Sequence, residues 1–329
     1  TELLPGVFLT AVQDRRFKTA CFSLSFLRPL RAGEAAMNAL LPSVLLRGSE
    51  KTPSIRAIAD RLDELHGASI GALVRKKGEI QLTGLFADCL EDQYAGEAVF
   101  SHLLDFVSEL LFCPRTEHGA FVPELVSQEC RNLQNAMQSV LDDKSAYCER
   151  QLLRAMCRGE RYACGRLGEP EELDKIDVRT LWAHDKSVLA SSRVELFYLG
   201  SKSVGEAEAL LQPLLAHLPR TACVPVGTNP GPQPQALRRF SEVMPLAQSR
   251  ISLGFRTFVD RSAVTFRCLT DEEIADYLRK GESFDKAGAY AVQGEGASLV
   301  ERVDGSLDSV IGLPVGRLLD EFPDLFAAR

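Results

Sequence analysis

A stretch crowded with proline and glycine divides this chain of 329 residues into two parts. Between residues 219 and 248 the sequence places six prolines and two glycines, which are Pro219, Pro225, Pro230, Pro232, Pro234, Pro245, Gly227 and Gly231. Proline lacks a backbone N–H and disfavours helical geometry in the preceding residue, so no long helix or inner strand continues through such a stretch. The sequence therefore predicts a linker over residues 219–248, with a domain over residues 1–218 and separate structure after it.

The hydrophobic pattern of the first part predicts an α+β domain. Residues 7–12 and 20–26 are expected to form two neighbouring strands, and residues 70–74 and 79–86 a hairpin whose turn holds the basic cluster at 75–78. Helical periodicity predicts helices over residues 33–46, 53–66, 93–112, 119–140, 143–158 and 205–218, a pair of helices over 170–190, and one more strand over 193–199. Strands and helices do not alternate regularly, so we expect a mixed sheet with helices packed on one face and not a doubly wound fold.

Composition and charge exclude several kinds of function. The formal net charge is −7, which argues against a surface that binds nucleic acid or an anionic membrane. A hairpin turn explains the basic cluster at 75–78 better than a phosphate site does. No apolar run reaches the ~18–20 residues that a membrane span needs, and the first residues do not form a signal segment. The nine cysteines are odd in number and include no C-x-x-C pair. These features predict reduced thiols in a cytoplasmic protein that binds neither nucleic acid nor membrane.

Five segments of the first part, by their order and spacing, resemble the insulinase/pitrilysin-type metallopeptidases. They are Leu4-Pro5-Gly6-Val7, Leu45-Leu46-Arg47-Gly48-Ser49-Glu50-Lys51, Leu65-His66-Gly67-Ala68, Gln128-Glu129-Cys130-Arg131-Asn132 and Ile251-Ser252-Leu253-Gly254-Phe255-Arg256-Thr257. The resemblance covers residues 1–257. It implies the half-clamshell fold of these enzymes over the first part and the start of a second, similar half over residues 249–258.

The metal-binding motif of that family is degenerate in this chain. Active members carry H-x-x-E-H on the first helix, where two histidines and a distal glutamate bind Zn²⁺ and the motif glutamate activates water. When the sequences are aligned on residues 45–51, the histidine positions hold Ala39 and Ser43 and the base position holds Pro42. Glu129 matches the distal ligand, and without a second ligand we expect it to be a solvated or capping residue. The resemblance thus implies a non-catalytic subunit with no metal or other cofactor, partnered by a catalytic or homologous peptidase-family subunit.

The second part resembles the C-terminal portion of the Maf-type nucleoside triphosphate pyrophosphatases. Its pattern predicts a small α/β fragment over residues 263–329, with strands over residues 264–269 and 297–303 and helices over 271–280 and 313–322. The resemblance covers residues 263–320. It is carried above all by the segment Phe284-Asp285-Lys286-Ala287-Gly288-Ala289-Tyr290-Ala291-Val292-Gln293-Gly294.

Three residues of that segment, Asp285, Lys286 and Gln293, are candidates for contact with a nucleotide; the alternative is that they are packing and turn residues of a truncated domain. The ammonium group of Lys286 can neutralise a phosphate, and the amide of Gln293 offers both a donor and an acceptor. The front half of the pyrophosphatase family supplies a phosphate loop and the carboxylates that bind metal. Residues 1–256 contain no counterpart of that half, because they resemble a different fold.

Three hypotheses about function follow. The first is a non-catalytic metallopeptidase-family scaffold that acts by protein interaction, and it accounts for most of the residues. The second is an enzyme, a Maf-type nucleoside triphosphate pyrophosphatase of the dTTP/UTP class, completed by another chain. The third is a fusion artefact that joins two neighbouring genes and retains only the C-terminal part of the pyrophosphatase. We favour the first hypothesis, which predicts that the chain is not an enzyme.

Overall fold

The structure is a computed structural model, and it describes residues 1–227, 239–244, 249–252, 254, 263–281, 292 and 294–304. The chain divides into two compact units, Thr1–Gly254 and Phe255–Arg329, and each is described by itself. None of the helices in the described ranges is long and apolar enough to cross a membrane.

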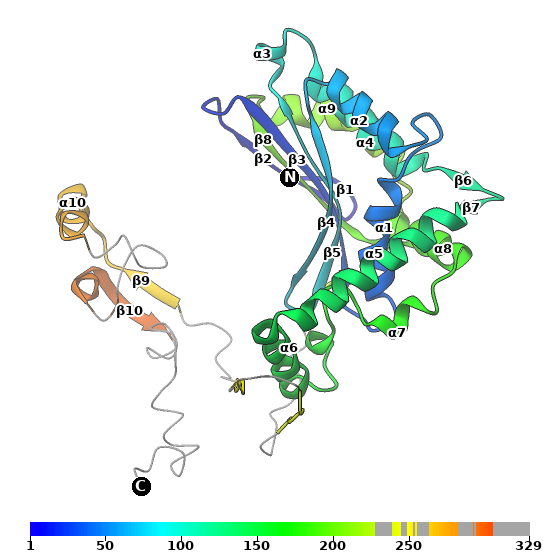
Figure 1. Ribbon diagram of the computed structural model, residues 1–329. Coiled ribbons are helices and arrows are strands. Elements are labelled where there is room, and N and C mark those ends of the chain that lie inside the picture. Colours follow the sequence, from blue (N-terminus) through cyan, green and yellow to red (C-terminus); the bar gives the residue numbers. More distant parts are fainter. Residues whose placement is uncertain are drawn as a thin grey trace. The chain divides into compact units, whose positions relative to one another are not determined.

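Six strands of the first unit form one mixed sheet (Figure 1). In spatial order they are β1 (Glu2–Leu4), β2 (Val7–Gln13), β8 (Arg193–Gly200), β3 (Thr19–Pro29), β5 (Ile80–Leu90) and β4 (Ser69–Lys77). Strands β2 and β8 run parallel, and the other neighbouring pairs run antiparallel. The prediction that β2 and β3 are neighbours was wrong, because β8 lies between them and pairs with both.

Helices pack on one face of this sheet, as expected from the sequence (Figure 1). The elements outside the sheet are α1 (Ala35–Leu45), α2 (Ile55–Glu64), α3 (Asp92–Ala95), α4 (Val99–Phe112), β6 (Thr116–Glu117), β7 (Ala120–Phe121), α5 (Pro123–Asp142), α6 (Lys144–Met156), η1 (Arg161–Ala163), α7 (Pro170–Leu173), α8 (Val178–Ser191) and α9 (Val204–Ala216). Every second side chain of β3, namely Phe22, Leu24 and Phe26, is buried and joins one core with side chains of α1, α4, α8 and α9. The first unit is therefore an α+β fold with one sheet layer and one helix layer.

The basic residues 75–77 belong to strand β4 and not to the hairpin turn, so their predicted place was wrong. The turn between β4 and β5 uses Gly78, whose φ of +61° suits glycine. Lys76 has a structural role in the strand, because its ammonium group donates to the backbone carbonyls of Tyr162 and Cys164 over 2.6 and 2.9 Å.

The helix predicted over residues 93–112 is interrupted. Gly96 adopts a φ of +78° and ends α3, and α4 begins at Val99. A residue with this left-handed conformation stops a helix, and glycine adopts it without the steric cost of a Cβ atom. The sequence signal for the break was therefore the glycine itself.

The second unit, where it is described, consists of a two-stranded antiparallel sheet and helical segments. Strand β9 (Ala263–Phe266) pairs with β10 (Val300–Asp304), and α10 (Asp271–Arg279) and η4 (Glu295–Leu299) lie between them in the sequence. A second peptidase-like half is predicted to begin over residues 249–258, of which 253 and 255–258 lie outside the described residues. The helix predicted over 313–322 also lies outside them.

Candidate functional site

The positions that match the metal-binding motif lie on helix α1. Ala39 and Pro42 are buried, and Ser43 is half-buried. A spacing of four residues puts Ala39 and Ser43 one turn apart on the same side of the helix. This side faces α5, since Ala36, one turn before Ala39, packs in a cluster with Met137 of α5.

Glu129, the match to the distal metal ligand, is bound to Arg47 just beyond the end of α1. Two nitrogens of the Arg47 guanidinium contact Oε1 of Glu129, and Nδ2 of Asn132 donates to the same oxygen over 3.1 Å. The Glu129 side chain is only 7% exposed. The expectation of a solvated or capping glutamate was therefore wrong, because the guanidinium group compensates the charge of a buried carboxylate.

The two contacts define how α1 and α5 face each other. Arg47 follows α1 and pairs with Glu129 near the start of α5, whereas Ala36 near the start of α1 packs with Met137 near the end of α5. The two helices therefore run antiparallel. Ala39 and Ser43 occupy the stretch between these contacts, so the structure brings three of the four motif positions to one helix–helix interface.

The side chains at these positions are poor metal ligands. Zn²⁺ is held in proteins by cysteine, histidine and carboxylate groups, and the methyl group of Ala39 and the ring of Pro42 offer no donor atom. Oε1 of Glu129 is already bound to Arg47. Within the described part of the chain, no group of three or more His, Cys, Asp or Glu side chains is arranged to hold a metal ion.

The contact of Arg47 with Glu129 was not predicted from the sequence. The available signal was the position of Arg47 four residues after Ser43, which continues the same face of the helix towards α5. Its partner Glu129 is separated from it by 82 residues, a distance that no local pattern bridges.

Pro42 changes the hydrogen bonding inside α1. In a regular helix the N–H of residue 42 would donate to the carbonyl of Asn38, and proline has no N–H. The hydroxyl group of Thr83 on β5 donates to that carbonyl instead, over 2.6 Å. The carbonyl that the proline leaves free is thus satisfied from the sheet.

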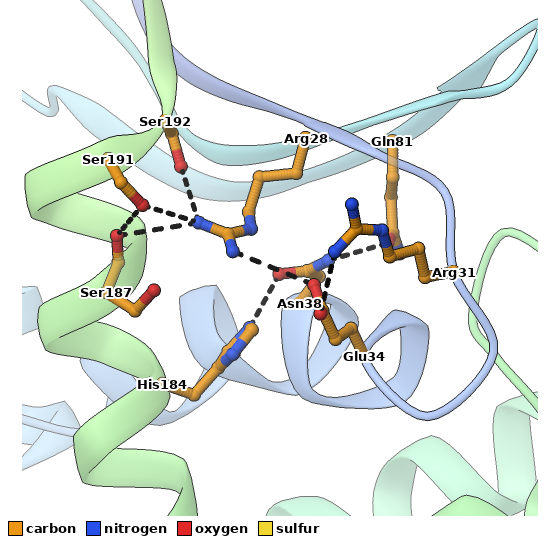
Figure 2. Close-up of polar contacts among 9 residues, drawn as sticks. All are labelled: Arg28, Arg31, Glu34, Asn38, Gln81, His184, Ser187, Ser191 and Ser192. Carbon is orange, nitrogen blue, oxygen red and sulfur yellow. Dashed lines mark hydrogen bonds and ion pairs between the residues drawn. The ribbon is translucent and has the colours of Figure 1, made fainter. Parts of the chain in front are cut away.

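The side chain of Asn38 joins α1 to the sheet and to α8 (Figure 2). Its Nδ2 donates to Oε1 of Gln81 over 2.9 Å, and its Oδ1 lies 2.7 Å from Nε2 of His184. Nε2 of Gln81 in turn donates to the carbonyls of Ala35 and Arg166. Burial, helped by the nearby guanidinium of Arg28, lowers the pKa of His184 to about 4, so the imidazole is neutral at neutral pH.

Arg28 of β3 contacts the carboxyl end of α8, next to this network (Figure 2). The side chain is 7% exposed, and one terminal nitrogen donates to the carbonyl of Ser187 and to the hydroxyl groups of Ser191 and Ser192 over 3.2–3.4 Å. The other terminal nitrogen lies 3.7 Å from Oε2 of Glu34. A positive charge at the carboxyl end of a helix is favourable, so the contacts of Arg28 stabilise the end of α8.

The amino end of α1 is also tied down from outside the helix. Glu34, at the N-cap position, makes no side-chain capping bond. Oε2 of Glu172 on α7 instead accepts a 3.1 Å hydrogen bond from the backbone N–H of Ala36. Helix α1 is therefore held at its start by Glu172, in its middle by Thr83 and at its end by the Arg47–Glu129 ion pair.

The candidate nucleotide-binding residues Asp285, Lys286 and Gln293 lie outside the described residues. In the described part of the same unit, Arg267 links strand β9 to its neighbours by hydrogen bonds. Arg267 donates to Oε1 of Glu273 over 2.7 Å and to the carbonyl of Ser298 over 2.8 Å.

Comparison with known proteins gives different relatives for the two parts. Over 256 residues the chain is 27% identical to the probable inactive metalloprotease YmfF of Bacillus subtilis, a stretch that makes up 77% of this chain and 60% of that protein. A solved structure of a conserved protein from Enterococcus faecalis is 27% identical with a TM-score of 0.63, covering 67% of this chain and 52% of that one. The peptidase M16 inactive domain from Pseudomonas fluorescens shares the fold, with 16% identity and a TM-score of 0.54 over 68% of this chain and 51% of that one.

The C-terminal region has relatives of another kind. A family model described as Maf-like protein matches residues 243–325. Over 66 residues the chain is 52% identical to the dTTP/UTP pyrophosphatase of Lachnoclostridium phytofermentans, a stretch that makes up 20% of this chain and 34% of that enzyme. The chain therefore spans 60% of the length of its metalloprotease relative and about a third of this pyrophosphatase. The first part resembles an inactive metallopeptidase and the second the C-terminal part of a Maf-type protein.

Proposed function

We propose that this chain is a non-catalytic member of the metallopeptidase fold family and acts as a scaffold by binding a catalytic or homologous peptidase-family subunit. The observation that supports this most strongly is the ion pair between Arg47 and Glu129. It occupies the carboxylate that an active relative would use as its distal metal ligand. Ala39 and Ser43 supply no imidazole beside it.

Metal binding at this interface would face two separate costs. The Arg47 guanidinium would have to leave Glu129, and its positive charge would then lack a counter-ion in a partly buried position. The ion would then have one carboxylate as a strong ligand, whereas structural and catalytic Zn²⁺ sites use at least three protein ligands. Catalysis would further need a base, and Pro42 has no titratable group.

The partner role is supported by the extent of the resemblance. The two matched solved structures contain about as much chain again as the part that this protein covers, since the coverage is 52% and 51%. The part of this chain that matches them is thus about half of a larger fold, which supports a surface on which a peptidase-family part can dock. We accordingly assign the chain an interaction role and no chemistry of its own.

The proposal is tested on the purified full chain. We expect far less than one zinc per chain by elemental analysis and no cleavage of unstructured peptides. We also expect a stoichiometric complex, by size-exclusion chromatography with light scattering, with a subunit of the same organism that carries an intact H-x-x-E-H motif. One zinc per chain together with peptide cleavage would overturn the non-catalytic role, and failure to bind every such subunit would overturn the partner role.

A second candidate function is favoured by one specific observation. The Maf-like family model matches residues 243–325, and identity to dTTP/UTP pyrophosphatases reaches 52% there. The alternative is a nucleotide pyrophosphatase that acquires its front half from another chain. It predicts conversion of dTTP or UTP to monophosphate and pyrophosphate, with loss of turnover in Lys286→Ala and Gln293→Ala.

The third hypothesis, a fusion artefact, makes a different prediction. Sequencing of the source locus across codons 245–270, together with the intact mass of the protein, tests whether one reading frame encodes both parts. An interrupted frame would support the artefact. A continuous frame and a matching mass would exclude it.

We also place the chain in the cytoplasm. All nine cysteines are free thiols, and Cys113 and Cys268 are exposed. Exposed thiols persist where the compartment is reducing. Cell fractionation that finds the chain outside the cytoplasm would contradict this assignment.

A further inference from the structure

A small cavity lies beneath Pro42, where α1 and α8 meet the sheet. It has room for about one water molecule. Its lining is apolar except for the side chains of two residues, Asp185 of α8 and Thr83 of β5. The proposed function uses neither residue.

Asp185 is a buried acid without hydrogen bonds. Its exposed fraction is 0%, and neither carboxylate oxygen has a hydrogen-bond partner. Nζ of Lys186 lies 3.5 Å from Oδ2, but the Lys186 side chain is 46% exposed and its ammonium group also lies 3.8 Å from the centre of the Trp182 ring. An ionised carboxylate in such surroundings is unfavourable unless it gains a proton or water.

Thr83 provides an acceptor for a proton on Asp185. Its hydroxyl hydrogen is committed to the carbonyl of Asn38, the group that Pro42 leaves free. The lone pairs of the Thr83 oxygen are therefore available to accept a hydrogen bond. A neutral Asp185 can donate to that oxygen through the single water molecule for which the cavity has room.

We infer that Asp185 and this cavity form a proton-controlled switch in the packing of α1 against α8. In the neutral form Asp185 donates to the water molecule, the water donates to the Thr83 oxygen, and the Thr83 hydroxyl donates to the carbonyl of Asn38. In the ionised form the carboxylate needs more water than the cavity holds. Loss of the proton therefore loosens α8 from α1, the helix that carries Ala39, Pro42 and Ser43.

Among the residues that line the cavity, Asp185 is the titratable one. The elements packed against it contribute apolar lining residues, such as Phe26 of β3, Leu41 of α1 and Leu111 of α4. On α8 itself, Lys186 faces the carboxylate and His184 faces Asn38. Burial raises the pKa of Asp185 to about 6, partly offset by Lys186, so the change falls between pH 5 and 7.

Hydrogen exchange of the full chain tests this inference. The opening equilibrium of the α1 and α8 amides is measured at pH 5.5 and 7.5, after correction for intrinsic exchange rates, in the unchanged chain and in Asp185→Asn. With a pKa of about 6 in the closed state and 3.8 in the open state, the ratio of the two opening constants should rise about fourfold between these pH values. Taking the ratio cancels the titration of His184, which both chains share.

Two further variants make the result decisive. Asp105→Asn removes an exposed acid on α4 and should match the unchanged chain at both pH values. Lys186→Gln removes the ammonium group that faces Asp185, and it should move the loosening to higher pH. A ratio that stays constant from pH 5.5 to 7.5 would overturn the inference. If Asp185→Asn does not fold, an unshifted transition in Lys186→Gln would overturn it as well.

Discussion

The hydroxyl group of Thr83 donates a 2.6 Å hydrogen bond to the backbone carbonyl of Asn38. Pro42, four residues later, has no backbone N–H to donate to this carbonyl. A proline inside a helix removes a hydrogen bond, and here a side chain of the neighbouring strand replaces it. The proline at the position of the catalytic base is thus accommodated by the fold.

Replacing Thr83 by valine should reveal this relationship. Thr83→Val keeps the shape of the side chain but leaves the buried carbonyl of Asn38 without a donor, which should reduce the free energy of unfolding by about 1–3 kcal/mol. In a Pro42→Ala background residue 42 regains its N–H, so the same change should cost much less. Urea denaturation of the four chains measures the difference, and equal costs in both backgrounds would show that the hydroxyl does not replace the missing bond.

The ion pair between Arg47 and Glu129 predicts a strong effect of single substitutions. Arg47→Ala leaves a buried, uncompensated carboxylate, so we expect the free energy of unfolding to fall by about 3–5 kcal/mol. Replacing both partners, as in Arg47→Met with Glu129→Leu, should recover much of the loss. The exposed pair Arg61–Glu64 is the matched control, because Arg61→Ala should cost about 1 kcal/mol or less. Equal losses in the two single variants would contradict the role of burial.

Reconstructing the metal motif tests what blocks metal binding. The triple change Ala39→His, Pro42→Glu and Ser43→His restores the ligand types but leaves the Arg47 guanidinium on Glu129. We expect tight binding of about one Zn²⁺ per chain by calorimetry only when Arg47→Gln is added. Equally tight binding by the triple variant alone would show that Arg47 does not compete with the ion.

The sequence predicted the composition of this site better than its contacts. The loss of ligands at Ala39 and Ser43 and of the base at Pro42 follows from alignment alone. The bonds of Arg47 and Thr83 do not, because each partner is more than forty residues away and is brought near only by folding. The position of β8 between β2 and β3 escaped prediction for the same reason, since pairing between distant strands leaves no local signal.

Gly168 should tolerate no side chain. A Cβ atom there would lie 2.6 Å from the backbone nitrogen of Ala36, at the start of α1, and its φ is +79°. Gly159 has a similar φ of +88° but open space around it, so Gly159→Ala isolates the cost of the conformation. Gly168→Ala should lower the melting temperature clearly more than Gly159→Ala, because it adds overpacking of about 1–3 kcal/mol. Equal melting temperatures would mean that the contact with α1 can relax freely.

The dependence of stability on pH combines two buried groups with opposite effects. Asp185 has a pKa of about 6 in the folded chain against 3.8 in the unfolded one, so the folded state holds the proton more tightly and stability falls as pH rises from about 4 through 6. His184 has a pKa of about 4 when folded against 6.5 when unfolded, so stability falls as pH drops from 6.5 to 4. In the unchanged chain the two effects largely offset each other over this range.

In Asp185→Asn, the pH dependence of stability that comes from His184 should therefore become visible. Because the amide cannot ionise, the variant should become more stable relative to the unchanged chain as pH rises, by up to about 3 kcal/mol near pH 7.5, with the gain vanishing towards pH 4. Its own stability should rise steeply between pH 4 and 6.5, where His184 alone still acts. Urea denaturation over pH 4–7.5 measures both curves, with Asp105→Asn as the control whose curve follows the unchanged chain. Parallel curves for Asp185→Asn and the unchanged chain would mean that Asp185 does not retain a proton on folding.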